Sequence, residues 1–355
     1  MENTEEEKVV DIDEDESLVG NLFNLSSYGV DYPIESLVRK LTNESFFIPD
    51  FQRKFVWSQN QASRFIESLL LGLPVPGIFV FKEEDTGKHL VIDGQQRLKS
   101  LMYYYSGEFG EEENSKIFKL SGLNSEWQGK RYKDLNENDK LRLDDGVIHT
   151  IVFKQDAPTD NMDSVYEVFE RINTGGMKLS PQEIRHCVSY GTFTALLMDL
   201  NKNEDWRSIF GKENSRLKDV ELILRFLTFY YFWEAYESPL KSFISHFLET
   251  NRDITPEFAL EVSSLFSTTI AKIRSSIGDK AFRPTRGINA AFYDSVMVGL
   301  AKRLNNGPEI SDQKVKEIYN SLLENGEYVA LFSDTTSAVT NVHSRMSMSI
   351  EAFTN

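Results

Sequence analysis

The sequence predicts an α+β protein, with an α/β domain over residues 26–178 followed by an all-helical domain over residues 179–355. Two short apolar runs, at 77–81 and 89–92, have the length of strands and alternate with helix-like segments. Beyond residue 180 the apolar spacing is helical almost throughout. Together these observations favour a small sheet with helices in the first half and packed helices in the second.

Charge is distributed unevenly along the 355 residues, whose formal net charge is −16. Residues 1–17 hold nine acidic residues and one lysine, so this segment contributes −8 and the remainder another −8. We expect residues 1–25 to form an acidic, disordered leader. The acidic body argues against broad, nonspecific binding of nucleic acid. It does not exclude a local basic groove that includes Arg53, Lys54 and Arg64.

Composition also limits the class of protein and its location. A hydrophobic content of 40% and an aromatic content of 12% are typical of a folded protein with real cores. No apolar run approaches the length that spans a membrane, and the acidic N-terminus is unlike a secretory signal or transit peptide. The single cysteine, Cys187, excludes an intrachain disulfide and fits a cytoplasmic location. The five histidines lack the spacing of a zinc site.

A helix and an extended segment open the first domain. Apolar spacing at 34–41 predicts a short amphipathic helix, whereas the Pro-containing aromatic stretch 47–57 predicts an extended segment. Ser58 and Gln61 then form a capping-box pattern, which begins a helix that ends at Gly72.

Two strands follow and lead to the centre of the domain. We expect 77–81 and 89–92 to pair as a hairpin, and a helix over 95–105 to leave the second strand. Residues 106–145 are polar and contain several glycines, which predicts an elaborated loop region with short strands. A further strand is expected at 147–153.

Strong capping signals mark the passage to the second domain. A helix with apolar residues between 165 and 172 ends at a Gly-Gly pair. Ser180, Pro181 and Glu183 then supply an N-cap, a first-turn proline and a capping-box acid. The next long helix is apolar on all sides, which predicts a buried core helix. The helices expected from there on lie at 220–236, 255–277, 288–304, 311–323 and 343–353.

The candidate site is the joint between the second strand and the helix that follows it, where residues 90–97 read L-V-I-D-G-Q-Q-R. Backbone N–H groups at a helix N-terminus attract anions, and Arg97 adds a forked donor suited to phosphate. Asp93, at the strand end, has the position of a carboxylate that holds magnesium or positions a water. The joint therefore predicts a phosphate-binding site.

A purely structural role for the same residues is an open alternative. Asp93 can serve as a helix N-cap, Gly94 can serve only the turn, and Arg97 can pair with a nearby acid. Short motifs match by chance, so the functional interpretation depends on other signals in the chain.

Two other segments provide such signals. Gln52 and Arg53 can donate to phosphate or base, and Trp57 can stack on a base, although Trp57 fits a core position better. Asn173 and Thr174 lie where a helix gives way to a loop, a common place for ligand contacts. Helix C-capping is the structural alternative for this second pair.

Several familiar catalytic motifs are missing from the sequence. It contains no Walker-type G-x-x-x-x-G-K-[ST] loop, no G-x-G-x-x-G and no G-x-S-x-G elbow. Cys187 follows His186 directly on a helix-like stretch, so the two side chains diverge and Cys187 is expected in the core.

Three motifs in fixed order resemble the N-terminal domain of GmrSD-type restriction endonucleases. They are I-P-D-F-Q-R-K-F-V-W, V-I-D-G-Q-Q-R-L and F-E-R-I-N-T-G-G-M-K-L-S-P-Q-E-I-R, within roughly residues 30–250. The resemblance implies a ParB- and sulfiredoxin-like core, in which the D-G-Q-Q-R motif serves nucleotide binding and hydrolysis. It assigns this role to Asp93, Gly94, Gln95, Gln96 and Arg97, with Gln52 and Arg53 facing the same pocket. Together with the residue-based arguments above, we expect catalytic roles for Asp93, Gln95, Gln96 and Arg97 and a magnesium ligand at Asp93. The expected nucleotide contacts are Gln52, Arg53, Gly94, Arg97, Arg171, Asn173 and Thr174.

The chain departs from the full-length restriction enzymes in one respect. Those enzymes carry a second domain with an HNH-type nuclease motif, and no metal-binding His/Asn constellation follows residue 180. The resemblance therefore implies a stand-alone sensor or NTPase component of prokaryotic defence against phage or other foreign DNA. A separately encoded nuclease is the expected effector.

The leading hypothesis is a regulatory protein that binds and hydrolyses GTP or another NTP with magnesium. Asp93 would orient metal or water, Gln95 or Gln96 would position the attacking water, and Arg97 would stabilise phosphate charge. One alternative is a non-enzymatic module that binds DNA or a partner protein, with nucleotide as a switch. Another is a metal-dependent nuclease, for which the sequence lacks a second cluster of metal ligands. No membrane partner is expected, and oligomer formation stays open.

Overall fold

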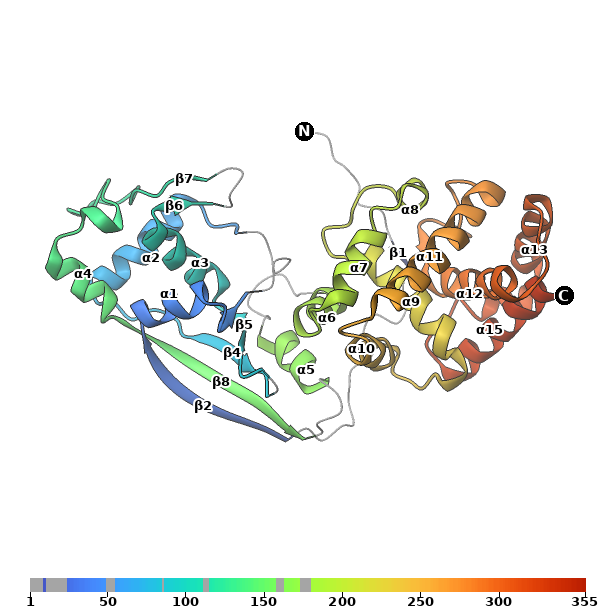
Figure 1. Ribbon diagram of the computed structural model, residues 1–355, viewed down its shortest axis with the longest axis horizontal. Coiled ribbons are helices and arrows are strands. Elements are labelled where there is room, and N and C mark those ends of the chain that lie inside the picture. Colours follow the sequence, from blue (N-terminus) through green and yellow to red (C-terminus); the bar gives the residue numbers. More distant parts are fainter. Residues whose placement is uncertain are drawn as a thin grey trace. The chain divides into compact units, whose positions relative to one another are not determined.

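The computed structural model describes residues 9–10, 24–48, 55–84, 86–110, 115–157, 163–172 and 180–355, apart from the side chains of Val10, Asp163, Glu170 and Cys187. Contacts divide the chain into two compact units, residues 22–178 and residues 1–21 with 179–355 (Figure 1). The first unit contains a mixed sheet with helices, and the second is predominantly helical. This architecture confirms the predicted fold class.

A five-stranded mixed sheet, in the order β2-β8-β4-β5-β3, forms the centre of the first unit. The pair β2 (Asn24–Pro33) and β8 (Val147–Ala157) is antiparallel, and β8 runs parallel to β4 (Ile78–Lys82). β4 and β5 (His89–Asp93) form the predicted antiparallel hairpin, and β3 (Phe46–Phe47) lies parallel to β5 at the edge.

One apolar core joins the helices of the first unit to its sheet. It contains buried side chains of the first four helices together with Val80, Val91 and Val152 from the strands. The fifth helix contacts β5. The elements outside the large sheet are α1 (Ile34–Thr42), α2 (Gln59–Leu70), α3 (Gln95–Ser106), the short hairpin of β6 (Glu108–Phe109) and β7 (Lys116–Ile117), the 3-10 turn η2 (Tyr132–Asp134), α4 (Glu137–Asp144) and α5 (Asp163–Ile172).

Local capping signals explain where the sequence-based assignment succeeds and where it fails in this unit. The capping box that begins α2 is present, with Ser58 Oγ accepting the Gln61 N–H at 3.3 Å. Helix α4 lies in the region predicted as loop, and it was missed because its sequence is polar. Asn136 is its N-cap, with Oδ1 accepting the Asp139 N–H at 2.8 Å. Strand β2 also differs from expectation, since it begins inside the predicted leader of residues 1–25.

The second unit is a bundle of helices. The Ser180 cap predicted for its first helix is present, with Ser180 Oγ accepting the Glu183 N–H at 3.1 Å. The helices are α6 (Pro181–Val188), α7 (Thr192–Leu200), α8 (Glu204–Phe210), α9 (Lys218–Phe232), α10 (Leu240–Thr250), α11 (Pro256–Ile277), α12 (Ala290–Asn306), α13 (Asp312–Glu324), α14 (Gly326–Ala330) and α15 (Val339–Thr354), with the 3-10 turn η4 (Trp233–Ala235) after α9.

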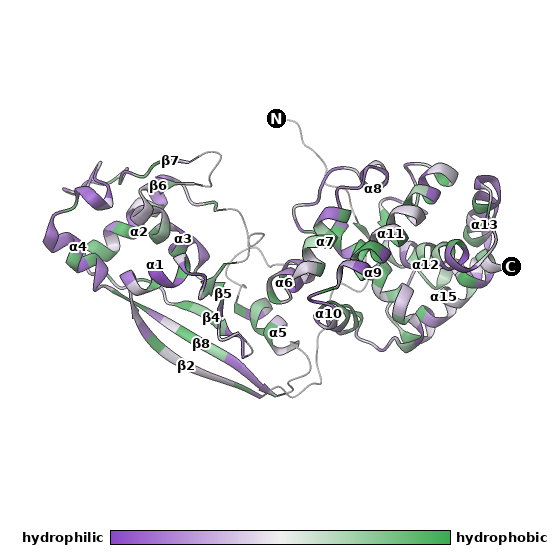
Figure 2. Ribbon diagram, viewed as in Figure 1, coloured by the Kyte–Doolittle hydropathy of each residue, from purple (hydrophilic) through white to green (hydrophobic). Residues whose placement is uncertain are grey.

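Helices α9 and α12 lie at the centre of this bundle. Both are buried along most of their length, and apolar residues predominate in α9 (Figure 2). The prediction of an all-round buried helix is therefore confirmed for α9. Among the described helices, none combines the length and hydrophobicity needed to cross a membrane.

A short strand from the acidic N-terminal segment completes the second unit. β1 (Val9–Val10) pairs in parallel with β9 (Ile288–Asn289), directly before α12. The expectation of a disordered leader over residues 1–25 therefore does not hold at these two residues.

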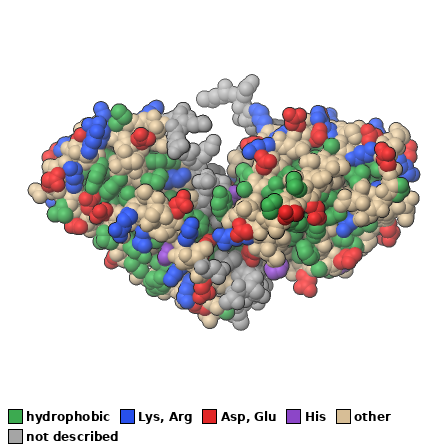
Figure 3. Space-filling model, in the orientation of Figure 1, with side chains coloured by type: hydrophobic (Ala, Val, Ile, Leu, Met, Phe, Trp, Pro, Cys, Tyr) green, Lys and Arg blue, Asp and Glu red, His purple; other side chains and the backbone are tan. Residues whose placement is uncertain are grey.

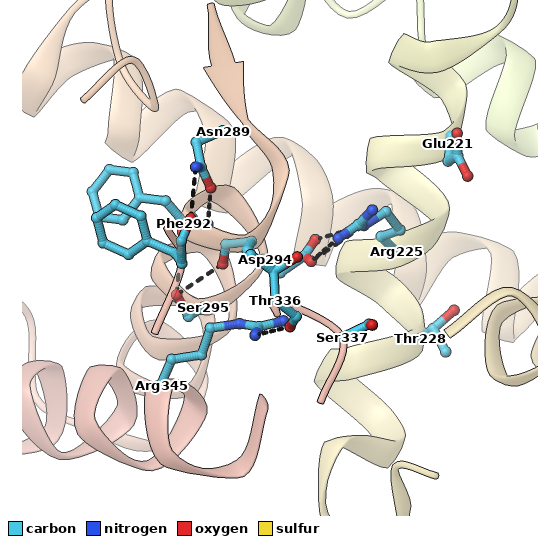
Figure 4. Close-up of polar contacts among 12 residues, drawn as sticks. Glu221, Arg225, Thr228, Asn289, Phe292, Asp294, Ser295, Thr336, Ser337 and Arg345 are labelled. Atoms are coloured by element: carbon cyan, nitrogen blue, oxygen red, sulfur yellow. Dashed lines mark hydrogen bonds and ion pairs between the residues drawn. The ribbon is translucent and has the colours of Figure 1, made fainter. Parts of the chain in front are cut away.

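The core of the second unit contains buried charges (Figure 4). Arg225 Nη2 lies 2.7 Å from Asp294 Oδ2, and both side chains are almost completely buried. Arg345 is also fully buried and donates through Nη1 to the carbonyl oxygen of Thr336. Its Nε and Nη2 find no hydrogen-bond partner among the described residues. Burial lowers the pKa of Arg345, whereas attraction to Asp294 raises it.

Candidate functional site

The predicted joint of strand, turn and helix is present in the first unit. β5 ends at Asp93, α3 begins at Gln95, and Gly94 between them is the helix N-cap in a left-handed conformation, with φ of +102°. Asp93 is thus not the N-cap, and the structural alternative that gave it that role is wrong. The carboxylate is instead the last side chain of the strand, opposite Phe79 in the sheet register.

Gly94 is required by both conformation and space. A Cβ at this position would lie 2.3 Å from Ile78 Cγ2, which is closer than atoms can approach without a shift of β4. Positive φ adds strain for any residue with a side chain. Because glycine has no side chain, Gly94 makes no side-chain cap hydrogen bond to the first turn of α3. A helix N-terminus of this kind favours an anion.

Arg97 fixes the geometry of the joint from the first turn of α3. Its Nη1 donates to the carbonyl oxygens of Pro76 and Gly77, both at 2.6 Å, and its Nη2 donates to Asp93 Oδ2 at 2.6 Å. The Arg97 side chain is only 12% exposed, whereas that of Asp93 is 41% exposed. The guanidinium is therefore held rigidly, beside a carboxylate that solvent can reach.

Gln96 ties a second segment to the joint. Its Oε1 accepts the backbone N–H groups of Val56 at 3.0 Å and Trp57 at 3.2 Å. The Trp57 ring packs edge-on against Phe65, with centroids 5.8 Å apart, which agrees with the core position preferred for Trp57. Gln96 thus anchors the last two residues of the first motif, which begin three residues after Arg53.

The structure describes only some of the remaining predicted site residues. Gln95 is half-buried at the start of α3. Arg171 lies on α5, its side chain is 78% exposed, and its Nε donates to Glu167 Oε1 at 2.6 Å. The structure brings together Asp93, Gly94, Gln95, Gln96 and Arg97, whereas Gln52, Arg53, Asn173 and Thr174 lie outside the described residues.

Sequence reasoning missed the residues on β4 and before it that complete the joint. Pro76 and Gly77 supply the two carbonyl oxygens for Arg97, and Ile78 fits against Gly94. The available signal was a Pro-Gly pair at the start of the strand predicted over 77–81. Such a pair identifies a turn, but it does not identify the cation that its carbonyl oxygens bind.

The residues of the joint offer a limited set of metal ligands. Asp93 Oδ2 is paired with Arg97, so Oδ1 is the oxygen left for a cation. Magnesium commonly binds through one or two carboxylates together with phosphate oxygens and water. In the described parts of the chain, no group of three His, Cys, Asp or Glu side chains could hold a metal. The joint therefore fits magnesium as a companion of a bound phosphate group.

The comparison with known proteins agrees with the motifs. A family model described as the GmrSD restriction endonuclease N-terminal domain matches residues 34–189. This segment extends from the start of α1 to just beyond α6 and contains the whole joint. No curated protein matches the chain.

Proposed function

Because residues 34–189 belong to the GmrSD restriction endonuclease N-terminal domain family, we propose that this chain is a nucleotide-binding component of a restriction-type defence system. The observation that carries the nucleotide proposal is the fixed guanidinium of Arg97 at the N-terminus of α3, where the N-cap Gly94 has no side chain. A positive side chain and a helix N-terminus at one place attract phosphate. The exposed carboxylate of Asp93 suits a magnesium ion that accompanies the phosphates.

The proposed ligand is GTP or another NTP with magnesium, and the proposed reaction is its hydrolysis. Magnesium would supply charge neutralisation for the phosphates. Arg97 binds phosphate oxygens, and Asp93 orients the metal or a water. Gln95 or Gln96 positions the attacking water, and Gln96 Oε1 also accepts two backbone N–H groups. A separately encoded nuclease would act as the effector.

Thermal-shift titration with ATP, GTP, CTP and UTP in the presence of magnesium tests the proposal. A ligand that binds only the native state stabilises it in proportion to the logarithm of its excess over Kd. We expect one nucleotide to raise the Tm of the wild type and of Arg39→Ala, an exposed control on α1. The shift should disappear in Arg97→Ala.

Arg97→Lys serves as a second variant, since it keeps the positive charge and loses the forked geometry. It should raise the apparent Kd for the nucleotide at least tenfold. Circular dichroism should show that the variant without nucleotide is still folded. Equal shifts in wild type and both folded Arg97 variants would refute a nucleotide site at this joint.

A second candidate function is a switch module without turnover, which binds DNA or a partner protein. It is favoured by the use of Gln96 Oε1 and Arg97 Nη1 in holding the surrounding backbone, and of Arg97 Nη2 in holding the Asp93 carboxylate. A nucleotide that moves these groups would also move the segments to which they are hydrogen-bonded. Phosphate release separates the two functions: nucleotide binding without release of phosphate above background, in wild type, supports the switch.

A further inference from the structure

A basic groove lies in the second unit, apart from the joint. It has a volume of about 530 Å³ and is lined by the end of α8 and by the loop between α11 and β9. Three cationic residues, Lys280, Arg283 and Arg286, contribute to its lining, against one acidic residue, Asp279. Asp279 is itself paired with Arg274, with Nε and Oδ1 3.3 Å apart. The lining therefore has an excess of positive charge.

This excess contrasts with the charge of the unit as a whole. Residues 180–355 contain 19 lysines and arginines and 22 aspartates and glutamates, and residues 1–17 of the same unit add a further charge of −8. On the face drawn in Figure 3, positive and negative side chains are interspersed. A local concentration of cations in a concave site raises the local concentration of anionic ligands.

The loop that carries these cations is held in a fixed shape. Arg283 Nη2 donates to the carbonyl oxygen of Ile209 at 2.6 Å, and its Nη1 donates to the carbonyl oxygens of Asp279 and Ala281, both at 3.1 Å. One arginine thus links the loop to the end of α8. Preorganised cations bind an anion with less loss of conformational entropy than mobile ones.

Backbone strain supports the same conclusion. Phe282 has a φ of +66°, which is unfavourable for an aromatic residue, yet it is completely buried. Its N–H donates to Tyr319 Oη at 2.9 Å, and its carbonyl oxygen accepts the Asn289 N–H at 2.9 Å. The surrounding structure holds the loop in this conformation, and strain of this kind concentrates at functional sites.

We propose that this groove binds the phosphate backbone of nucleic acid through Lys280 and Arg286, with Arg283 as the residue that positions the loop. Lys280 and Arg286 are exposed, and Thr285 adds a hydroxyl. The one aromatic ring in the lining, Phe210, is fully buried and cannot stack on a base. Contacts to phosphate without base stacking are typical of sequence-independent binding. The proposal does not depend on nucleotide binding at the joint.

Fluorescence anisotropy of a labelled 30-base-pair DNA duplex with the full chain tests the groove. Lys280→Ala/Arg286→Ala should weaken binding about tenfold at low salt and reduce the slope of log K against log salt by about 2, because each phosphate contact contributes about 0.9. The matched control is Lys314→Ala/Lys316→Ala on α13, which removes two exposed positive charges elsewhere in the same unit. The control should change affinity less than twofold.

Three results would overturn the proposal: no binding of duplex by wild type at 50 mM salt, equal loss in the groove and control variants, or binding of inorganic tripolyphosphate by wild type without binding of DNA. The two sites are tested separately. The groove variant should keep any nucleotide-dependent thermal shift, and Arg97→Ala should keep the affinity for duplex measured without nucleotide.

Discussion

Arg97 Nη2 lies 2.6 Å from Asp93 Oδ2, and Nη1 of the same guanidinium donates to the carbonyl oxygens of Pro76 and Gly77. One side chain thus joins the end of β5, the first turn of α3 and the loop before β4. A residue in this position serves the fold and would also meet any ligand at the joint. Useful variants are those that separate these two roles.

Asp93→Asn separates them, because the amide oxygen can still accept from Arg97 while the negative charge is lost. The pair is partly exposed, so we expect a loss of less than about 1 kcal/mol in the free energy of unfolding. We expect the difference in nucleotide-induced Tm shift between magnesium and EDTA to disappear. Asp31→Asn, an exposed carboxylate on β2, is the control. If the nucleotide-induced Tm shift of Asp93→Asn depends on magnesium as strongly as that of the wild type, Asp93 is not a metal ligand.

Gly94→Ala tests the close contact between the helix start and β4. The new methyl group meets Ile78 Cγ2 at 2.3 Å and occupies a residue with φ of +102°. Urea unfolding should show a loss of about 2–4 kcal/mol, from backbone strain and overpacking combined. Gly107→Ala at the other end of α3 is the matched control, since its φ is +82° and no atom lies within 4 Å of its Cβ. The control should lose only about 1 kcal/mol, and equal losses in the two variants would contradict the packing argument.

These glycines illustrate what the sequence does and does not predict at the joint. The D-G-Q-Q-R motif correctly predicts the strand, the turn and the helix, because periodicity and glycine are local signals. It does not predict that Gly94 rather than Asp93 is the N-cap, or that Gln96 holds Val56 and Trp57. Those facts depend on segments about 15 to 40 residues away in the chain, and short-range patterns contain no information about them.

The same distinction applies to the fold. Helices with strong caps, such as those after Ser58 and Ser180, are predicted with accurate starts. Strand β2 is missed because it lies at the edge of the sheet, beside β8 alone, and all its residues are exposed or half-buried, which leaves a weak hydrophobic pattern. The pairing of Val9–Val10 with Ile288–Asn289 joins residues that are far apart in sequence.

Asp294→Asn tests the buried ion pair of the second unit. It removes the negative charge that pairs with Arg225, whose side chain is 2% exposed, and breaking a buried pair in this way typically costs about 3–5 kcal/mol. Urea unfolding monitored by circular dichroism measures the loss. Asp199→Asn is the control, because its pair with Lys202 is 3.5 Å long and well exposed, and it should change stability by less than about 1 kcal/mol. A loss below about 1 kcal/mol in Asp294→Asn would mean that the core does not depend on the charge of Asp294.

His186 makes stability depend on pH in a defined window. It lies on α6, is 3% exposed, and burial lowers its pKa from 6.5 to about 4. Because the unfolded chain binds this proton more readily, the neutral imidazole contributes stability that is fully present above pH 6.5 and is lost as pH falls toward 4. We expect the free energy of unfolding to fall by about 2 kcal/mol between pH 7.5 and pH 5 from this residue alone. His186→Gln should remove that part of the pH dependence, whereas His246→Gln, at an exposed position, should retain it. Identical pH profiles for His186→Gln and wild type would show that His186 does not titrate with folding.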